Sequence, residues 1–246
     1  MLQSTMPSTI TPRIMSSELS LTAILHLLQL SDSALPTGAF SFSNTLESAA
    51  EWGVVRDEAS LESYTSQIVR TAALTDGIAA LEAWRAASEG DYSRLAAADQ
   101  MLYISKLNEE ARQMSQRMGR KLAELCSALL RQKLLTDWCD DIVKKRVAGT
   151  YAATQGLIAA LCGIDRKGLF CSLCYGAANI VLGAALRCTR TTHITTQGIL
   201  FRLGTLVEML YAEASEMEIG EMNSFAMQCD IMAALHEKGS KRLFMN

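Results

Sequence analysis

The sequence predicts an all-α protein, a single-domain bundle of about eight to ten helices. Alternating apolar and polar residues, the pattern of a strand, are nearly absent, whereas apolar residues recur at steps of three and four along most of the chain. Only three prolines interrupt 246 residues, and 49% of the residues are hydrophobic, enough to bury a substantial core. Because no Pro-rich or Ser-rich linker and no fixed-period repeat divides the chain, we expect one domain.

The clearest helical pattern covers residues 105–133. Its apolar stripe consists of Leu107, Ala111, Met114, Met118, Leu122, Leu125 and Leu129. The same spacing predicts helices over residues 19–30, 61–74, 78–87, 138–146, 150–161, 169–187 and 198–212. Gly90, Thr136 and the segments 163–168 and 189–196 separate these helices. The helical domain therefore extends over residues 19–222.

The two ends of the chain differ from this domain. Residues 1–18 contain two of the three prolines and many Ser and Thr residues, but too little apolar surface to order the segment by burial. We expect a mobile N-terminal arm there and no signal peptide, because a continuous apolar segment is absent. Residues 223–246 follow the last predicted helix as a separate C-terminal segment.

Charge and cysteine usage restrict the kind of partner and the compartment. The net charge is −3 and the pI is near 5.7, so we expect neither a nucleic-acid partner nor binding to an anionic membrane. Seven cysteines, an odd number, are scattered in apolar surroundings, which indicates reduced thiols in a cytoplasmic protein. Cys171 and Cys174 form a CxxC pair, but no further ligands complete a zinc site.

Small residues are concentrated in two helices of the second half. Residues 169–186 are uncharged for 18 residues, long enough to cross a membrane, yet half of them are Gly, Ala, Ser, Cys or Asn, which favours a helix buried on all sides in a soluble bundle. Gly156, Gly176 and Gly183 lie inside helical patterns, which implies a packing reason. The two helices form either the centre of the fold or a subunit interface, and the sequence leaves both open.

Catalytic motifs are missing. The chain contains no GxxxxGK[ST], GxSxG, HExxH or GxGxxG, and its three histidines, His26, His193 and His236, are far apart. Asp140 and Asp141 are adjacent, and neighbours on a helix do not face each other. An acidic run, Glu208, Glu213, Glu216, Glu218 and Glu221, is either solvated or complementary to a basic partner. We expect no catalytic residue and no metal site.

One loop stands out, in the stretch "LQLSDSALPTGAFSFSNTLE" at residues 28–47. Residues 31–33 compete for backbone hydrogen bonds, Pro36 lacks a donor and Gly38 relaxes the turn, so the preceding helix must end. Asn44 and Glu47 have the spacing of a capping box for the next helix. Phe40 and Phe42 are expected to anchor the loop to the core. Such a loop is either structural only or a recognition surface.

Four blocks of the chain, in order, resemble the UreF family of urease accessory proteins. The loop stretch resembles its N-terminal signature, LQLSDSxLPVGGFSHSxGLE, and "LNEEARQMSQRMGRKL" resembles its middle motif, with Asn108, Glu110, Arg112, Ser115, Gly119 and Leu122 in place. The Gly/Ala-rich helices and the ending "DIMAALHEKGSKRLFMN" also match. The chain departs from the family at Ala39, Phe42, Asn44 and Thr45, and "TRTTHITTQ" replaces a PLGQ-like element.

This resemblance implies a role without chemistry of its own. The family is all-α, dimeric and cytoplasmic, and it joins UreD (UreH in some systems) and the GTPase UreG to apo-urease for nickel delivery. Nickel and GTP then belong to the complex, and we expect this chain itself to bind no cofactor. Phe42 replaces the family's loop histidine, which argues against nickel binding by the loop and leaves a recognition surface.

Two docking elements are predicted on this basis. The loop element, called here the signature loop, comprises residues 36–47 and is expected near UreG or the dimer seam, with partner-binding residues Pro36, Gly38, Phe40, Ser41, Ser43 and Glu47. The C-terminal element, within residues 223–246, is expected to order when UreD binds, with His236, Glu237, Arg242, Leu243 and Phe244. Its alternative is self-docking of Leu243 and Phe244 onto the helical core.

Two other classes of function stay open. The chain could activate GTP hydrolysis by UreG by supplying or organising an arginine, for which Arg112 and Arg117 are the candidates. It could also be a helical enzyme with an unrecognised site, which predicts a buried polar pocket of converging titratable groups.

Overall fold

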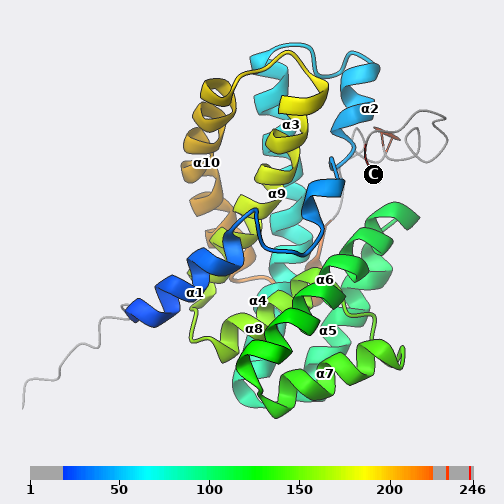
Figure 1. The fold of residues 1–246 in the computed structure, drawn as a ribbon, viewed down its shortest axis with the longest axis vertical. Helices are drawn as coiled ribbons and strands as arrows, with labels where there is room; N and C mark the ends of the chain where they lie inside the picture. The colour runs from blue at the N-terminus through cyan, green and yellow to red at the C-terminus, as the bar shows by residue number, and fades with distance from the viewer. Residues whose placement is uncertain (1–18, 224–230, 233–243, 245–246) are drawn as a thin grey trace, which may run out of the picture.

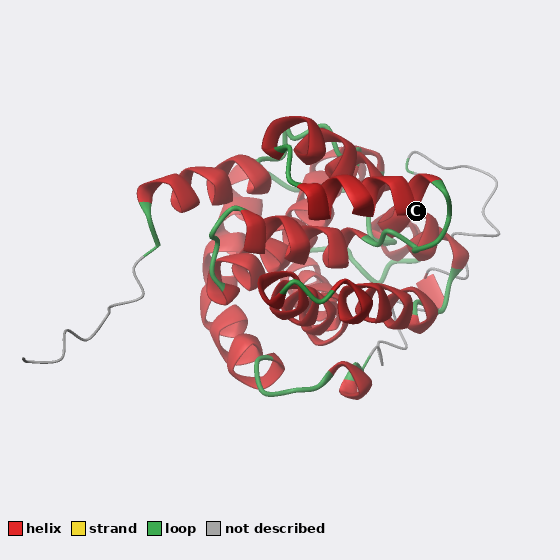
Figure 2. Cartoon of the chain, turned by 90° about the horizontal axis from the view of Figure 1, so that it is seen from below, coloured by secondary structure: helices red, strands yellow, loops and turns green. Residues whose placement is uncertain are grey.

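The computed structural model describes residues 19–223, 231–232 and 244. Within these residues it contains helices and no strand, which confirms the all-α prediction (Figure 2). The α-helices are α1 (Leu21–Ser31), α2 (Leu46–Glu51), α3 (Glu58–Ala72), α4 (Ile78–Glu89), α5 (Tyr92–Ser105), α6 (Glu109–Leu130), α7 (Lys133–Val143), α8 (Tyr151–Leu161), α9 (Arg166–Cys188) and α10 (His193–Ala214). Shorter elements are the 3-10 turns η1 (Ala39–Ser41) and η3 (Ile219–Glu221) and the π-helical turn η2 (Ala73–Gly77).

The helices form two packed groups (Figure 1). Helices α2, α3, α9 and α10 lie toward one end, and α5, α6, α7 and α8 lie toward the other. The second group surrounds Trp138, which is fully buried and donates from Nε1 to Thr154 Oγ1 at 3.0 Å. Helices α3 and α4 belong to one continuous rod, because η2 joins them without leaving the helical conformation. This rod contacts α9 and α10 through α3 and α8 through α4.

Side-chain caps explain where many helices begin. Ser20, Asp57, Asp91, Asn108, Asp165 and Thr192 each accept a hydrogen bond from a backbone N–H in the first turn of the helix that follows. The capping box expected from Asn44 is wrong. Helix α2 begins after Thr45, whose backbone is left-handed and whose side chain makes no capping bond. Thr45 Oγ1 instead lies 2.6 Å from Tyr64 Oη on α3.

The glycines of the two small-residue helices have different surroundings. A Cβ atom on Gly156 of α8 would lie 2.4 Å from the carbonyl oxygen of Ala80 on α4, so a close helix crossing requires glycine there. A Cβ on Gly176 or Gly183 of α9 would meet no atom within 4 Å. The predicted packing reason is therefore confirmed for Gly156 and is wrong for the other two.

Helix α9 is the one helix among the described residues long and apolar enough to cross a membrane. In its most apolar 18-residue window, 56% of the residues are buried. The prediction of a helix buried on all sides is wrong in part, because Cys171 and Tyr175 are exposed and a further face of α9 borders a cavity.

Candidate docking site

The signature loop folds back between α1 and α2. Gly38 has a φ of 85°, in the left-handed region that favours glycine, and starts the 3-10 turn η1. Phe42 is buried and anchors the loop in the core, as expected. Phe40, expected to be a second core anchor, is 73% exposed. The expectation for Phe40 is wrong, because the η1 turn directs the two rings to different environments.

Arg187, at the end of α9, is the residue on which the loop rests. Its Nη1 donates to the carbonyl oxygen of Phe40 at 3.0 Å, and its Nε donates to the carbonyl oxygen of Gly183 at 3.1 Å. The guanidinium carbon lies 4.0 Å from the centroid of the Phe40 ring and 4.2 Å from that of Phe244. Burial lowers the pKa of Arg187. A partly desolvated guanidinium between two aromatic faces is a strong cation–π arrangement.

Phe244, near the C-terminal end of the sequence, lies at the same place. Its side chain is 5% exposed and packs in a cluster that includes Leu46, Leu61 and Val181. Its backbone N–H donates to Glu47 Oε2 at 3.2 Å. Phe244 thus lies on the helical core, as the self-docking alternative predicts for it. We call Phe40, Glu47, Arg187 and Phe244 the Arg187 cluster.

The remaining predicted residues divide between surface and interior. Pro36, Gly38 and Ser41 are exposed beside Phe40, whereas Ser43 is fully buried. The other predicted C-terminal residues, His236, Glu237, Arg242 and Leu243, lie outside the described residues, as does the N-terminal arm, residues 1–18. Of the predicted partner-binding residues, the structure therefore gathers Phe40, Glu47 and Phe244 in the Arg187 cluster.

The two arginines considered for GTPase regulation lie on α6 and are not part of this cluster. Arg112 Nη1 donates to the carbonyl oxygen of Lys106 at 2.6 Å, and its Nη2 donates to Glu109 Oε2 at 3.1 Å. These bonds tie the guanidinium to the α5–α6 connection. Arg117, one and a half turns further along α6, is exposed. Arg117 is thus the more accessible of the two.

A cavity of about 570 Å³ opens beside the signature loop. Its walls come from the end of α1, the loop, α3, α6 and α9. The lining residues from α9 include Gly176, Ala177, Ile180, Gly183 and Arg187. Lys106 and Asp76 lie at another wall and form an ion pair with an Nζ–Oδ2 distance of 2.8 Å. The lining is mostly apolar.

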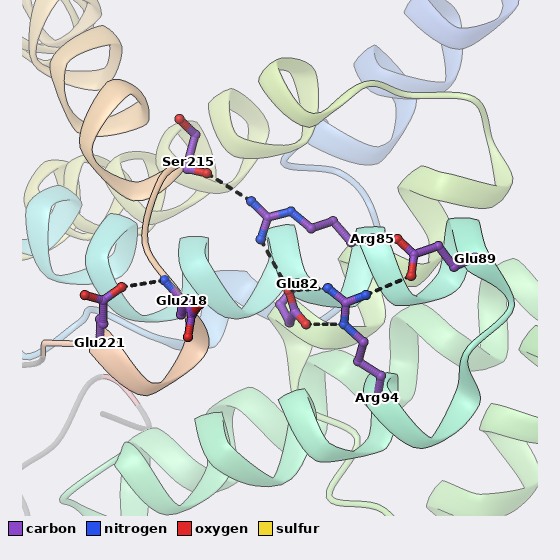
Figure 3. Close-up of polar contacts among 7 residues, drawn as sticks. All are labelled: Glu82, Arg85, Glu89, Arg94, Ser215, Glu218 and Glu221. Atoms are coloured by element: carbon purple, nitrogen blue, oxygen red, sulfur yellow. Dashed lines mark hydrogen bonds and ion pairs between the residues drawn. The ribbon is translucent and has the colours of Figure 1, made fainter.

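The acidic run near the end of α10 lies beside two separate sets of polar contacts (Figure 3). Arg85 Nη2 on α4 donates to the carbonyl oxygen of Ser215 at 3.0 Å. The Glu218 backbone N–H donates to Glu221 Oε2 at 2.7 Å and caps η3. Glu82 pairs with Arg85 and with Arg94 of α5 (Figure 3). Burial acts to raise the pKa of Glu82, but the arginine hydrogen bonds outweigh it and the pKa is lowered. Glu218 and Glu221 of the acidic run therefore have a structural role, because they cap η3.

No group of three or more His, Cys, Asp or Glu side chains that could hold a metal ion occurs in the described part of the chain. His26 is half-buried on α1 and His193 is the first residue of α10, so the structure does not bring these two together. The cysteines of residues 19–223 are not in disulfides. Burial raises the pKa of the Cys126 and Cys174 thiols to about 12, which leaves both protonated near neutral pH.

Arg187 is the site residue that sequence reasoning missed. The sequence did contain an indication of its importance, because Arg187 is the first charged residue after the uncharged run 169–186. A cation that ends so long an apolar run needs a partner or solvent. Its partners, Phe40 and Phe244, lie 147 and 57 positions away along the chain, and no local pattern joins positions so distant.

Comparisons with known proteins agree with these motifs. The family model UreF matches residues 55–204. A protein of Brucella canis (strain ATCC 23365 / NCTC 10854 / RM-666), "Urease accessory protein UreF 2", is 44% identical over 231 residues, which is 94% of this chain and 95% of that protein. "Urease accessory protein UreF" of Yersinia enterocolitica serotype O:8 / biotype 1B is 39% identical over 91% of this chain and 98% of its own length. The chain belongs to the UreF family of urease accessory proteins.

Proposed function

We propose that this protein is an adaptor in urease maturation. In this proposal it joins UreD (UreH), the GTPase UreG and apo-urease in the cytoplasm, so that nickel is inserted into the urease active site. The chain performs no chemistry itself, and nickel and GTP are held by the other components of the complex. The observation that carries the proposal is the Arg187 cluster, in which the two predicted docking elements meet.

The chemistry of the cluster suits recognition of a protein. Aromatic and arginine side chains dominate the binding energy of protein interfaces when they are packed and shielded from water. Phe40 has one ring face on the Arg187 guanidinium and is 73% exposed in total, so it offers a partner a rigid apolar contact. The neighbouring Pro36 and Ser41 are exposed as well. A protein that bound this surface would cover Phe40 first.

The cluster also couples the two docking elements. The Arg187 guanidinium lies over the rings of both Phe40 and Phe244, and Glu47 accepts a hydrogen bond from the Phe244 backbone. A partner that reorders the C-terminus therefore changes the support of the signature loop, and the reverse holds as well. Such coupling suits an adaptor whose partners must bind together.

Co-elution with UreD and UreG tests the proposal. The chain is co-expressed with each partner and analysed by size exclusion with light scattering, as wild type, as Phe40→Ala and truncated after Gly239. We expect Phe40→Ala to weaken binding of at least one partner by roughly tenfold or more, and the truncation to abolish co-elution with UreD. Phe201→Ala is the matched control, because Phe201 is equally apolar, exposed and on α10 outside the cluster. Full binding by both test variants would contradict the proposal.

A second function, stimulation of GTP hydrolysis by UreG, is favoured by the exposure of Arg117 on α6. An arginine that stabilises the transition state must reach the phosphates, and Arg117 is the more exposed of the two. Single-turnover hydrolysis by UreG in the presence of wild type, Arg112→Ala or Arg117→Ala tests it. Loss of stimulation with Arg117→Ala alone is the expected outcome, and equal turnover with all three proteins would exclude both arginines.

A further inference from the structure

Helix α10 is covered on one side only. Its buried residues, on the side that packs toward α3, α9 and η2, are Thr196, Ile199, Leu203, Leu210 and Ala214. On the opposite side, Ile194 is 86% exposed, Phe201 89% and Met209 62%. Phe201 is the most exposed large hydrophobic side chain of the described residues. A helix that keeps apolar side chains of this size in water has a face that another protein surface can cover.

The exposed side of α10 has the spacing of a helix–helix contact. Its positions recur at alternating steps of four and three, with Met209 beside them, and form what we call the α10 seam: Ile194, Gly198, Phe201, Thr205, Glu208 and Ala212. None of these residues is in the buried class. The small residues of the seam alternate with larger ones and leave room for the side chains of a second helix. From residue 194 to residue 212 the seam is roughly 27 Å long, enough for a partner helix of about five turns.

Charges at one end of the α10 seam select the kind of helix that fits. Arg202, the one basic residue of α10, is already engaged, because its Nη2 lies 3.1 Å from Glu58 Oε1 and 2.7 Å from Glu62 Oε2 on α3. Glu208 and Glu213 form no ion pair within the part of the chain that the structure describes. Glu213 lies in the last turn, where the helix macrodipole is negative and no basic residue compensates it. A cation from outside would therefore stabilise this end of α10.

We propose that the α10 seam binds an amphipathic helix of a partner protein, with large apolar residues at seven-residue spacing and Lys or Arg at the end beside Glu208 and Glu213. The inference rests on the adaptor function. The signature loop and the C-terminus are the predicted docking elements for UreG and UreD, so the urease apoprotein is the partner that still needs a surface. Helix α10 lies on the opposite flank of its helix group from α2, which follows the signature loop (Figure 1). A partner on the seam can thus be bound together with a partner at the signature loop.

Binding of the urease apoprotein to preassembled complexes tests the proposal. The full-length chain is purified with UreD and UreG as wild type, Phe201→Asp, Glu208→Lys/Glu213→Lys and Leu129→Asp, and biolayer interferometry measures binding of the apoprotein. We expect all four complexes to form, and Phe201→Asp and the double variant to weaken binding of the apoprotein at least tenfold. Added salt should slow association of the wild-type complex but not of the charge-reversed one. Leu129→Asp, at an exposed position of α6 in the other helix group, is the matched control and should bind as wild type does.

Cross-linking identifies the segment that occupies the α10 seam. A photoreactive benzophenone amino acid replaces Phe201 in the same complex, and mass spectrometry of the adduct is expected to find a helical, amphipathic and basic segment of urease. An adduct with residues 1–18 of this chain, with a second copy of it, or with an acidic segment of urease would overturn the proposal. Equal binding of the apoprotein by all four complexes would overturn it as well and would leave the adaptor function intact. Failure of the wild-type complex to form would contradict the adaptor function itself, and with it the assignment of the seam.

Discussion

Helices α8 and α9 are both rich in glycine and alanine, yet they use these residues in opposite ways. On α8, Gly156 lies against the backbone of α4, where a Cβ would come within 2.4 Å of the Ala80 oxygen. On α9, Gly176 and Gly183 face open space beside the signature loop. The comparison teaches that the same small residues lie at a close helix crossing on α8 and beside open space on α9.

The α8 region has a second close contact, at its N-terminus. A Cβ on Gly119 of α6 would lie 2.1 Å from the carbonyl oxygen of Gly149. The buried carboxylate of Asp99 accepts hydrogen bonds from the Gly149 and Thr150 N–H groups at 2.9 and 2.7 Å and from Thr150 Oγ1 at 2.6 Å. The turn before α8 is therefore fixed from both sides. No equivalent support is found for the open face of α9 among the described residues.

The largest expected effect is that of Gly156→Ala. The added Cβ cannot be accommodated by a side-chain movement, because the atom that it meets is backbone, so α4 and α8 must separate. We expect a loss of about 1–3 kcal/mol in the free energy of unfolding, measured by urea denaturation. An unchanged midpoint would show that the helices can move apart at no cost and would remove the distinction between α8 and α9.

Asp99→Asn is expected to come next. The substitution replaces one carboxylate oxygen by an NH₂ group, which would face a backbone N–H of Gly149 or Thr150 and leave a buried donor without an acceptor. The expected loss in unfolding free energy is about 1–3 kcal/mol at pH 7. Denaturation of both proteins in urea measures it, and equal stabilities would contradict the structural role of Asp99.

The pH dependence of this difference follows from burial. Burial raises the pKa of Asp99 above its ordinary value, although the hydrogen bonds from Thr150 and Gly149 oppose the shift. The folded state then holds a proton that the unfolded state has already lost, so this contribution to stability is complete below the unfolded pKa of about 3.9 and is lost as the pH rises through the folded pKa. The advantage of wild type over Asp99→Asn should shrink as the pH rises through this range. A stability advantage of wild type that grows with pH would show that the hydrogen bonds to Asp99 outweigh the effect of burial on its pKa.

The smallest effect has the opposite sign and belongs to α9. Gly183→Ala should stabilise the chain by about 0.5–1 kcal/mol, because alanine favours the helix and the new Cβ meets no atom. Thermal unfolding measures this change. Destabilisation would mean that the face is covered within the protomer. Gly176→Ala gives an independent repeat at the other open position.

The positions of many helices could be predicted from the sequence, but the contacts between the helices could not. Periodicity placed the middle of the apolar stripe of α6 correctly, at Met118 and Leu122, which are buried. The two ends of the predicted stripe, Leu107 and Leu129, are exposed. Periodicity could not predict that Phe42 is buried and Phe40 exposed, because both occur in the same loop and the conformation of η1 directs Phe40 outward. It could not distinguish Gly156 from Gly183 either, since the difference lies in which helix crosses each position. The capping box failed because Asn44 and Thr45 adopt left-handed backbone conformations before α2.

The candidate site was predicted in its parts rather than as a whole. The motifs indicated the signature loop and the C-terminus as separate docking elements, and the structure joins Phe40 and Phe244 through Arg187. Motif similarity reports which segments matter, whereas a contact across 147 positions depends on the packing of the whole bundle.

The π-helical turn η2 determines the direction in which α4 faces relative to α3 about the common axis of the rod. A five-residue turn inserts one residue into a helix, and one residue corresponds to a rotation of about 100° about the axis. The rod from Glu58 to Glu89 can thereby present α3 to one group of helices and α4 to the other. Gly77 fits this turn against the Phe170 ring, and Asp76 is directed to Lys106. Deletion of a single residue in η2 would rotate α3 relative to α4 about their common axis. The end of the molecule that carries the Arg187 cluster would then turn relative to the end built around Trp138.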